Sequence, residues 1–288
     1  MEYMGYKENR ERRVQIFEDT LNMCEQEEEL ANAIKNSREH TILYKNPEEE
    51  LRIVNLRRFE DKAEITVTRN RTFEAAYNLF RQHTNARVGV LNFASAVNPG
   101  GGVSNGSSAQ EECLCRCSTL YPCLQAPELW KNYYNYHRIR HDSYYTNRCV
   151  YIPDVIVLKS DMDCPERMPK SERYKVDVIT CAAPNLHGNR LAEQAGMQCT
   201  LSTEDLHDLF KIRIEGIMRV GVQHQIDVLV LGAFGCGAFH NDPVIVAECF
   251  KEVLETYKYA FSKIEFAIFC QSSDDVNYQV FSSTIKDN

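Results

Sequence analysis

Residues Leu91–Glu112, LNFASAVNPGGGVSNGSSAQEE, decide the fold of this 288-residue chain. An apolar run, Val88–Phe93, leads into three consecutive glycines, Gly100–Gly102, and the segment ends in two adjacent carboxylates. The apolar run is typical of a buried strand, and the glycines let the backbone bend freely and approach a ligand closely. The segment therefore predicts a strand followed by a loop for a phosphorylated ligand.

The two carboxylates belong to Gln110-Glu111-Glu112, which begins a sequence with helical character, QEECLCRCSTLYPCL. Acidic residues in a first helical turn also complement the helix dipole, and a glycine triplet alone is more often an ordinary flexible turn. Each feature is weak by itself. Their combination within about twenty residues favours a catalytic site.

A second segment, Asp227–Pro243, has a similar layout with the sequence DVLVLGAFGCGAFHNDP. Its apolar start fits a buried strand, and Gly235 and Gly237 permit a tight turn at the carboxyl end of that strand, where open α/β sheets bind ligands. An Asn-Asp pair can cap the next helix, with Pro243 at its first position. A plain strand-to-helix turn without a ligand is the alternative interpretation.

The rest of the chain alternates predicted strands and helices. The strands are expected at 42–44, 65–68, 88–93, 149–158, 175–181, 227–231 and 263–270. The helices are expected at 71–83, 110–125, 128–140, 203–224 and 243–260, with Ser202 and Asp205 as a capping pair. This alternation predicts an α/β fold: a mixed sheet with helices on both faces.

The triplet GGG, a seven-residue spacer and QEE closely resemble the signature of the poly(ADP-ribose) glycohydrolases, which are built on a macrodomain. The resemblance extends to Asn98-Pro99, and the second segment is similar to the second phosphate loop of the microbial-type members. It implies a macrodomain-like catalytic domain over residues 41–288. Residues 1–40 would form an N-terminal helical extension, since 7–36 are mostly charged helical sequence.

The resemblance also implies roles for single residues. Glu112 is the expected acid, and Glu111 the expected ligand of the adjoining ribose hydroxyls. Asn98 would bind the terminal ribose and Phe239 would press on it. The other residues implied in substrate binding, with glycine N–H groups clamping the diphosphate, are Gly100, Gly101, Gly102, Gln110, Gly235, Cys236 and Gly237.

Cleavage of a ribose–ribose O-glycosidic bond requires a proton for the departing oxygen and stabilisation of an oxocarbenium-like carbon, then a water at that carbon. One carboxyl group can serve both proton transfers. Because neighbouring helical residues project about 100° apart, we expect Glu111 and Glu112 to point at different atoms and divide the work. Repulsion from the neighbouring carboxylate and a bound diphosphate would favour the protonated form of Glu112.

These features predict a glycosidase that releases ADP-ribose from the end of a poly(ADP-ribose) chain, because no clasp for a continuing chain can be identified. The alternatives are a hydrolase of mono-ADP-ribosyl groups or ADP-ribose esters, and a non-catalytic ADP-ribose-binding module. The intact Gln110-Glu111-Glu112 disfavours the binding module, which needs no acid. The expected partners are poly(ADP-ribose) or ADP-ribosylated proteins.

Composition narrows the partners further. The formal net charge of −8 argues against broad electrostatic capture of nucleic acid or an anionic membrane. No apolar stretch approaches the roughly 18 residues of a membrane span, and the sequence MEYMGYKENRERR lacks the apolar core of a secretory signal. We therefore expect an intracellular protein, cytoplasmic or nuclear.

The twelve cysteines raise the question of a metal site. Cys113, Cys115 and Cys117 are spaced C-x-C-x-C, whereas zinc sites pair cysteines as C-x₂₋₄-C. We expect free, mostly buried thiols, no metal and no cofactor. The aromatic cluster around Trp130–Tyr145 is expected to serve packing, and Asn185, after the strand YKVDVITCAAPN, to line the pocket.

Overall fold

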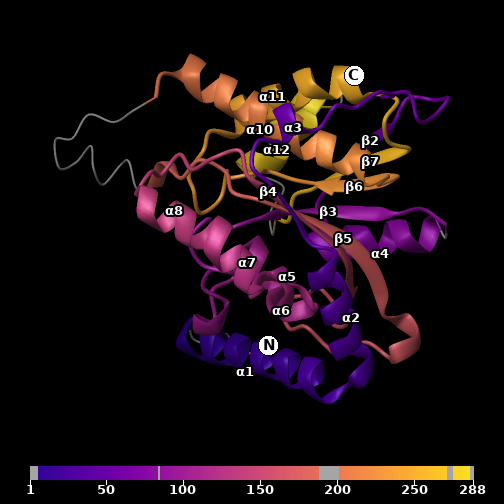
Figure 1. The fold of residues 1–288 in the computed structure, drawn as a ribbon, viewed down its shortest axis with the longest axis vertical. Coiled ribbons are helices and arrows are strands. Elements are labelled where there is room, and N and C mark those ends of the chain that lie inside the picture. The colour runs from indigo at the N-terminus through magenta and orange to yellow at the C-terminus, as the bar shows by residue number, and fades with distance from the viewer. Residues whose placement is uncertain (1–5, 84, 188–200, 271–274, 286–288) are drawn as a thin grey trace.

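The computed structural model describes residues 6–83, 85–187, 201–270 and 275–285 (Figure 1). Their strands form one seven-stranded sheet in the order β1-β4-β5-β3-β6-β7-β2. The strands β5, β3, β6, β7 and β2 run parallel, whereas β4 is antiparallel to both β5 and β1. The strand bounds are β1 Ile42–Tyr44, β2 Glu64–Thr68, β3 Val88–Phe93, β4 Cys149–Val157, β5 Tyr174–Cys181, β6 Val228–Leu231 and β7 Lys263–Ala267.

Helices cover both faces of this sheet. In Figure 1, α10 (Thr203–Gln223), α11 (Pro243–Tyr257) and α12 (Val276–Ile285) lie above it. The lower layer contains α1, α2 and α5 to α7. The remaining helical bounds are α1 Tyr6–Gln26, α2 Glu28–Glu39, α3 Pro47–Glu50, α4 Thr72–Gln82, η1 Val103–Asn105, α5 Gln110–Cys117, α6 Leu120–Leu124, α7 Pro127–Leu129, the π-helical η2 Trp130–Tyr134, α8 Asn135–Arg140 and η3 Lys170–Glu172.

The alternation of side chains along a strand divides the core into two clusters. On β6, Val228 and Val230 pack into the core cluster between the sheet and α1, α2 and α5. Leu229 and Leu231 pack into the cluster between the sheet and α10 and α11. All four are buried. Because successive strand residues face opposite sides, a strand buried on both faces has to be apolar throughout. The predicted mixed sheet with helices on both faces is confirmed.

All seven predicted strands are present, and two details of the helix prediction are wrong. The helix expected over 110–125 breaks at Ser118, which is extended and forms a bridge with Val157. The short α3 and the C-terminal α12 were not predicted, because four residues carry no periodicity and α12 lacks charged residues to mark a polar face. The predicted caps are confirmed: Ser202 accepts from the N–H of Asp205, and Asp242 from that of Val244.

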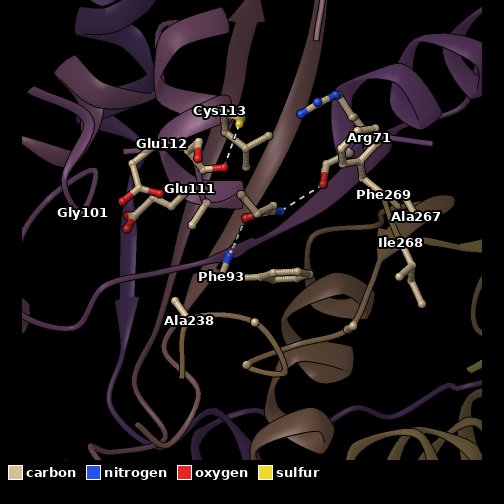
Figure 2. Close-up of a pocket in the computed structure, with 18 of the residues that line it drawn as sticks. Arg71, Phe93, Gly101, Glu111, Glu112, Cys113, Ala238, Ala267, Ile268 and Phe269 are labelled. Carbon is tan, nitrogen blue, oxygen red and sulfur yellow. Dashed lines mark hydrogen bonds between the residues drawn. The ribbon is translucent and has the colours of Figure 1, made fainter. Parts of the chain in front are cut away.

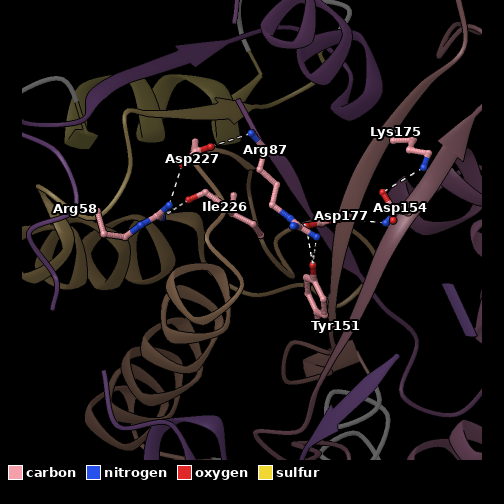
Figure 3. Close-up of polar contacts among 8 residues, drawn as sticks. All are labelled: Arg58, Arg87, Tyr151, Asp154, Lys175, Asp177, Ile226 and Asp227. Carbon is pink, nitrogen blue, oxygen red and sulfur yellow. Dashed lines mark hydrogen bonds and ion pairs between the residues drawn. The ribbon is translucent and has the colours of Figure 1, made fainter. Parts of the chain in front are cut away.

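The amino ends of the parallel strands are closed by a polar network. The carboxylate of Asp177 accepts hydrogen bonds from Arg87 and from the hydroxyl of Tyr151, and Arg58 pairs with Asp227 at 2.8 Å (Figure 3). These charged groups are paired with one another. They leave the opposite edge, where the parallel strands end, for a ligand.

The helices α1 and α2 pack against the body of the fold. Phe17 of α1 and Leu30 and Ile34 of α2 are buried in the same core cluster as Leu114 of α5 and Val150 of β4. The division into an extension, 1–40, and a catalytic domain, 41–288, stays a prediction.

Candidate active site

A cavity of about 470 Å³ lies at the carboxyl edge of the sheet. Every parallel strand contributes to its wall at or just beyond its end: Arg71 after β2, Phe93 of β3, Ala183 after β5, Ala233 after β6 and Ala267 of β7. The first turn of α5 supplies the remaining polar wall through Gln110, Glu111 and Glu112. The two sequence segments predicted to bind a ligand therefore meet at one cavity.

The first glycine loop brings the backbone against the two carboxylates. Gly100 and Gly101 have φ values of 70° and 57°, in the left-handed region that favours glycine. A Cβ on Gly101 would lie 2.5 Å from Oε1 of Glu112 and 3.3 Å from Oε2 of Glu111. Gly101 therefore provides the space in which both carboxyl groups sit, as Figure 2 shows.

Glu111 is held from several sides. Its side chain is buried, with 3% exposed, and its oxygens accept from the N–H of Ser95 at 2.7 Å and from Nδ2 of Asn92 at 3.3 Å. Burial raises the pKa of Glu111 to about 8, and the nearby Glu112 adds to the rise, although donors from Ser95, Asn92 and the N–H of Gly100 oppose it. Glu111 is therefore a fixed carboxyl group whose protonated form is favoured by burial.

Glu112 is held at only one oxygen. The N–H of Gly102 donates to its Oε1 at 2.9 Å, whereas its Oε2 is buried without a hydrogen-bond partner among the described residues. A buried polar atom without a partner is costly unless a ligand or water supplies one. Oε2 is therefore the carboxyl oxygen that the described residues leave without a partner.

The expectation that Glu111 and Glu112 point at different atoms is wrong in part. Their Cα–Cβ bonds diverge on the helix, but both carboxyl groups come within about 3.3 Å of the one position at Gly101. Two rotatable methylenes let adjacent glutamates converge, so the angle between helix positions does not decide where the oxygens lie. The division of work comes instead from their different hydrogen-bond partners.

The N–H groups of the glycine triplet are already engaged. Gly101 donates to the carbonyl of Asn98 at 2.9 Å, Gly102 donates to Glu112, and Gly100 to Glu111. The expected clamp on a diphosphate through these three groups stays a prediction. In the structure, the N–H groups of Gly100 and Gly102 hold the two carboxyl groups.

The second glycine loop offers open donors. The N–H groups of Gly237, Ala238 and Phe239 donate to no acceptor within the described ranges, and all three residues line the cavity. Gly235, with φ 78°, turns the chain beside them. Consecutive N–H groups without a described partner, in residues that line one cavity, are typical of an anion site.

Gln110 links the catalytic helix to the sheet. Its Oε1 accepts from the N–H of Phe93 at 2.9 Å, and its Nε2 donates to the carbonyl of Leu91 at 2.7 Å and to Thr72 at 3.1 Å. Both ends of the side-chain amide are thus used by the protein. Gln110 lines the cavity, but these contacts fix the start of α5 against the end of β3.

The predicted residues divide into two groups. The cavity wall contains Gly101, Gln110, Glu111, Glu112, Gly235, Gly237 and Phe239. Outside it are Asn98, Gly100, Gly102, Cys236 and Asn185. The exposed Asn98 accepts from Arg138 at 2.7 Å, and Cys236 is partly buried in the core, so both lie behind or beside the wall. The binding roles expected for this second group stay predictions.

Sequence reasoning missed several residues at the site. Asn92 is fully buried in β3 and contacts Glu111, and a polar residue inside the apolar run VGVLNF was the available signal. At the other end of the cavity, the guanidinium of Arg71 lies 3.7 Å from the ring centroid of Phe269, which is 44% exposed. Nothing in the local sequence marked this pair, because β2 and β7 meet only in the sheet.

The described cysteines are mostly buried, as expected. Eleven cysteines fall within the described residues, all are free, and seven of them are buried; Cys199 lies outside those residues. Burial raises the pKa of Cys115 and Cys117 well above the ordinary thiol value. Tyr133 and Tyr134 of the aromatic cluster are core residues, as expected.

The same described residues contain no group of three or more His, Cys, Asp or Glu side chains placed to hold a metal ion. Across these ranges, no helix has both the length and the apolar character that a bilayer crossing requires.

A mixed α/β sheet with paired carboxyl groups and two glycine loops at its carboxyl edge agrees with the expected macrodomain-type glycosidase. The family model of the microbial-type poly(ADP-ribose) glycohydrolase (PARG) catalytic domain matches residues 11–160. The chain belongs to this family and is a glycosidase of the poly(ADP-ribose) glycohydrolase type. A comparison with curated proteins finds no match.

Solved structures agree with the family. The chain is similar to poly(ADP-ribose) glycohydrolase from Thermomonospora curvata, with 28% identity, a TM-score of 0.82 and coverage of 95% of this chain and 99% of that one. A second structure from that organism holds the inhibitor ADP-HPD. The Deinococcus radiodurans enzyme in complex with ADP-ribose is 31% identical, with a TM-score of 0.76 and coverage of 88% and 97%.

Proposed function

We propose that this enzyme releases the terminal ADP-ribose unit from poly(ADP-ribose), with Glu112 as the acid. The observation that carries the proposal is the unpartnered Oε2 of Glu112, a residue of the cavity wall. A proton on this oxygen passes to the departing ribose oxygen as the C–O bond breaks. The carboxylate then takes a proton from the water that adds to the ribose carbon, which returns Glu112 to its starting state.

Glu111 supports this step from behind. Its oxygens are fixed by Ser95 and Asn92, so the carboxyl group can meet the ribose hydroxyls without moving. Burial raises its pKa to about 8, which favours the neutral carboxyl group beside a diphosphate. The fixed oxygens of Glu111 support a binding role for it, and the unpartnered Oε2 of Glu112 supports proton transfer by Glu112.

The open N–H groups of Gly237, Ala238 and Phe239 support the second loop as the diphosphate site. The end of the cavity formed by Arg71, Ile268 and Phe269 has an exposed ring and a planar cation, which suit the face of adenine. The D. radiodurans relative binds ADP-ribose. We therefore place the adenosine at Phe269 and the terminal ribose between Phe239 and Glu112.

We further propose that the reaction needs no metal, because Glu112 alone can give and take the proton. We also propose that the protein works in a reducing, intracellular compartment, since free buried thiols are usual there.

The test is to incubate the protein with labelled poly(ADP-ribose) and, separately, with a mono-ADP-ribosylated protein, and to resolve the products over time. Free ADP-ribose from the polymer is expected from the first time points. Product from the mono-ADP-ribosylated protein alone would favour the hydrolase of single adducts, and tight ADP-ribose binding without any product would favour a binding module. Glu29→Gln, an exposed change on α2, is the matched control for Glu112→Gln.

A further inference from the structure

The helix α1 contacts the segment that joins the glycine triplet to the two carboxylates. The carbonyl of Asn105 accepts from Nε and Nη2 of Arg10 at 3.0 and 2.8 Å, and the carbonyl of Gly106 accepts from Nε of Arg13 at 2.6 Å. These contacts join residues more than ninety positions apart in the chain. A cationic donor makes a stronger hydrogen bond than a neutral one, so the turn is firmly held.

The backbones themselves approach closely at the same place. Gly106 has φ 73°, and a Cβ on it would lie 2.3 Å from the carbonyl oxygen of Arg10. Only a residue without a side chain lets α1 lie this near the turn. The contact is therefore fixed by backbone shape as well as by the two arginines.

The turn in turn holds Gly102, the residue that contacts Glu112. The carbonyl of Gly102 accepts from the N–H groups of Asn105 at 3.0 Å and Ser107 at 3.2 Å. The N–H of the same residue donates to Oε1 of Glu112 at 2.9 Å. A chain of contacts thus runs from Arg10 through Asn105 and Gly102 to Glu112.

The helix α1 also contacts the far end of α5. The hydroxyl of Thr20 donates to the carbonyl of Arg116 at 2.5 Å, and the buried Arg116 donates to the carbonyl of Ser107 at 2.5 Å. Lys159, which follows β4, donates to the carbonyl of Ile16 in α1 at 2.7 Å. The turn and the catalytic helix α5 are therefore both held against α1.

We infer that Arg10 and Arg13 are positioning residues, through which α1 sets the orientation of the Glu112 carboxyl group. This inference rests on the proposed role of Glu112 as the acid. Neither arginine lines the cavity, so ligand binding does not require them. Orientation of an acid is felt in the transition state, so their loss lowers kcat more than it weakens ADP-ribose binding.

The test compares Arg10→Ala/Arg13→Ala with Arg38→Ala. Arg38 is a matched control, because this arginine of α2 donates Nε and Nη2 to the carbonyl of Pro122, away from the catalytic turn. The double variant is expected to lose about tenfold or more in kcat, with the Kd for ADP-ribose within about threefold of wild type. Arg13→Lys, which keeps one cationic donor, is expected to retain most of the turnover.

Two results would overturn the inference: a kcat no lower than that of Arg38→Ala, or losses in kcat that follow melting temperature alone across all the variants. Hydrogen exchange at the amide of Gly102 supplies a readout that does not depend on activity. It should become faster in the double variant, or in Arg13→Gln if the double variant does not fold. Unchanged exchange would reject the inference, whereas faster exchange in a protein that yields no ADP-ribose would reject only the proposed function.

Discussion

The backbone N–H of Gly102 lies 2.9 Å from Oε1 of Glu112. This contact separates the two oxygens of the carboxyl group, because Oε1 is held by the protein while Oε2 has no partner among the described residues. Positioning and proton transfer therefore use different atoms of the same side chain. The adjacent Glu111 has both oxygens engaged, which accounts for the different roles proposed for the two residues.

Glu112→Gln is expected to lower turnover by about a hundredfold or more, because an amide cannot give a proton to the departing oxygen. The amide oxygen can still accept from Gly102, so folding and ADP-ribose affinity should be retained. Single-turnover assays and calorimetry test this. Turnover within threefold of wild type would reject Glu112 as the acid.

Gly101→Val is expected to weaken ADP-ribose binding by about 2 kcal/mol or more. Its Cβ would lie 2.5 Å from Oε1 of Glu112, on a backbone whose φ of 57° disfavours a β-branched residue. Both carboxyl groups would have to move, so turnover should fall as well. Gly101→Ala tests the close contact without the β-branch, and circular dichroism checks that each variant is folded. Unchanged affinity in a folded variant would contradict the role of this loop.

The sequence was sufficient for the sheet and for the location of the cavity. Strand periodicity, glycines after apolar runs and the rule that ligands bind at carboxyl ends are local signals, and they placed both loops at one edge. The partners of the glycine N–H groups were not predictable in this way. Whether Gly102 faces a diphosphate or Glu112 depends on a turn that is held by α1, almost a hundred residues away.

The sequence was also insufficient to predict the protonation of the carboxyl groups. A neighbouring carboxylate and a diphosphate were expected to control protonation, but burial is the main cause of the raised pKa of Glu111. Burial of this side chain follows from the packing of α5 on β3, which composition does not show. Long-range contacts, such as Arg71 with Phe269, were missed for the same reason.

Glu111 should make the protein less stable as pH rises. Its pKa is about 8 in the folded protein against an ordinary value of 4.5, so between these pH values the folded state binds more protons than the unfolded state. Stability then falls with rising pH across this window. Glu111→Gln removes this titration. The difference in free energy of unfolding between this variant and wild type should therefore shift in favour of the variant by about 1 kcal/mol or more from pH 5 to pH 8. Urea unfolding at several pH values measures it, and a constant difference would refute the expectation.

A chelator and a mild reductant are expected to leave activity and melting temperature unchanged. The proposed chemistry uses only carboxyl protons, and the eleven described cysteines form no disulfide. Activity and thermal unfolding before and after treatment with EDTA or dithiothreitol provide the check. Activity lost with EDTA and restored by a divalent ion would reject the metal-free reaction.

Phe239→Ala and Phe269→Ala should act on different steps. Phe239 lines the cavity in the second loop and contacts the ring of Tyr145, and its proposed task is to press the terminal ribose toward Glu112. Loss of orientation is felt mainly in the transition state, so Phe239→Ala should lower kcat more than it weakens ADP-ribose binding. Phe269 lies at the opposite end with Arg71, so its loss should mainly weaken binding.

The wild-type enzyme should release monomeric ADP-ribose at early times with little short oligomer. Abundant early oligomers would overturn cleavage from the chain end, and equal effects of the two variants on kcat would remove the proposed orientation of the ligand.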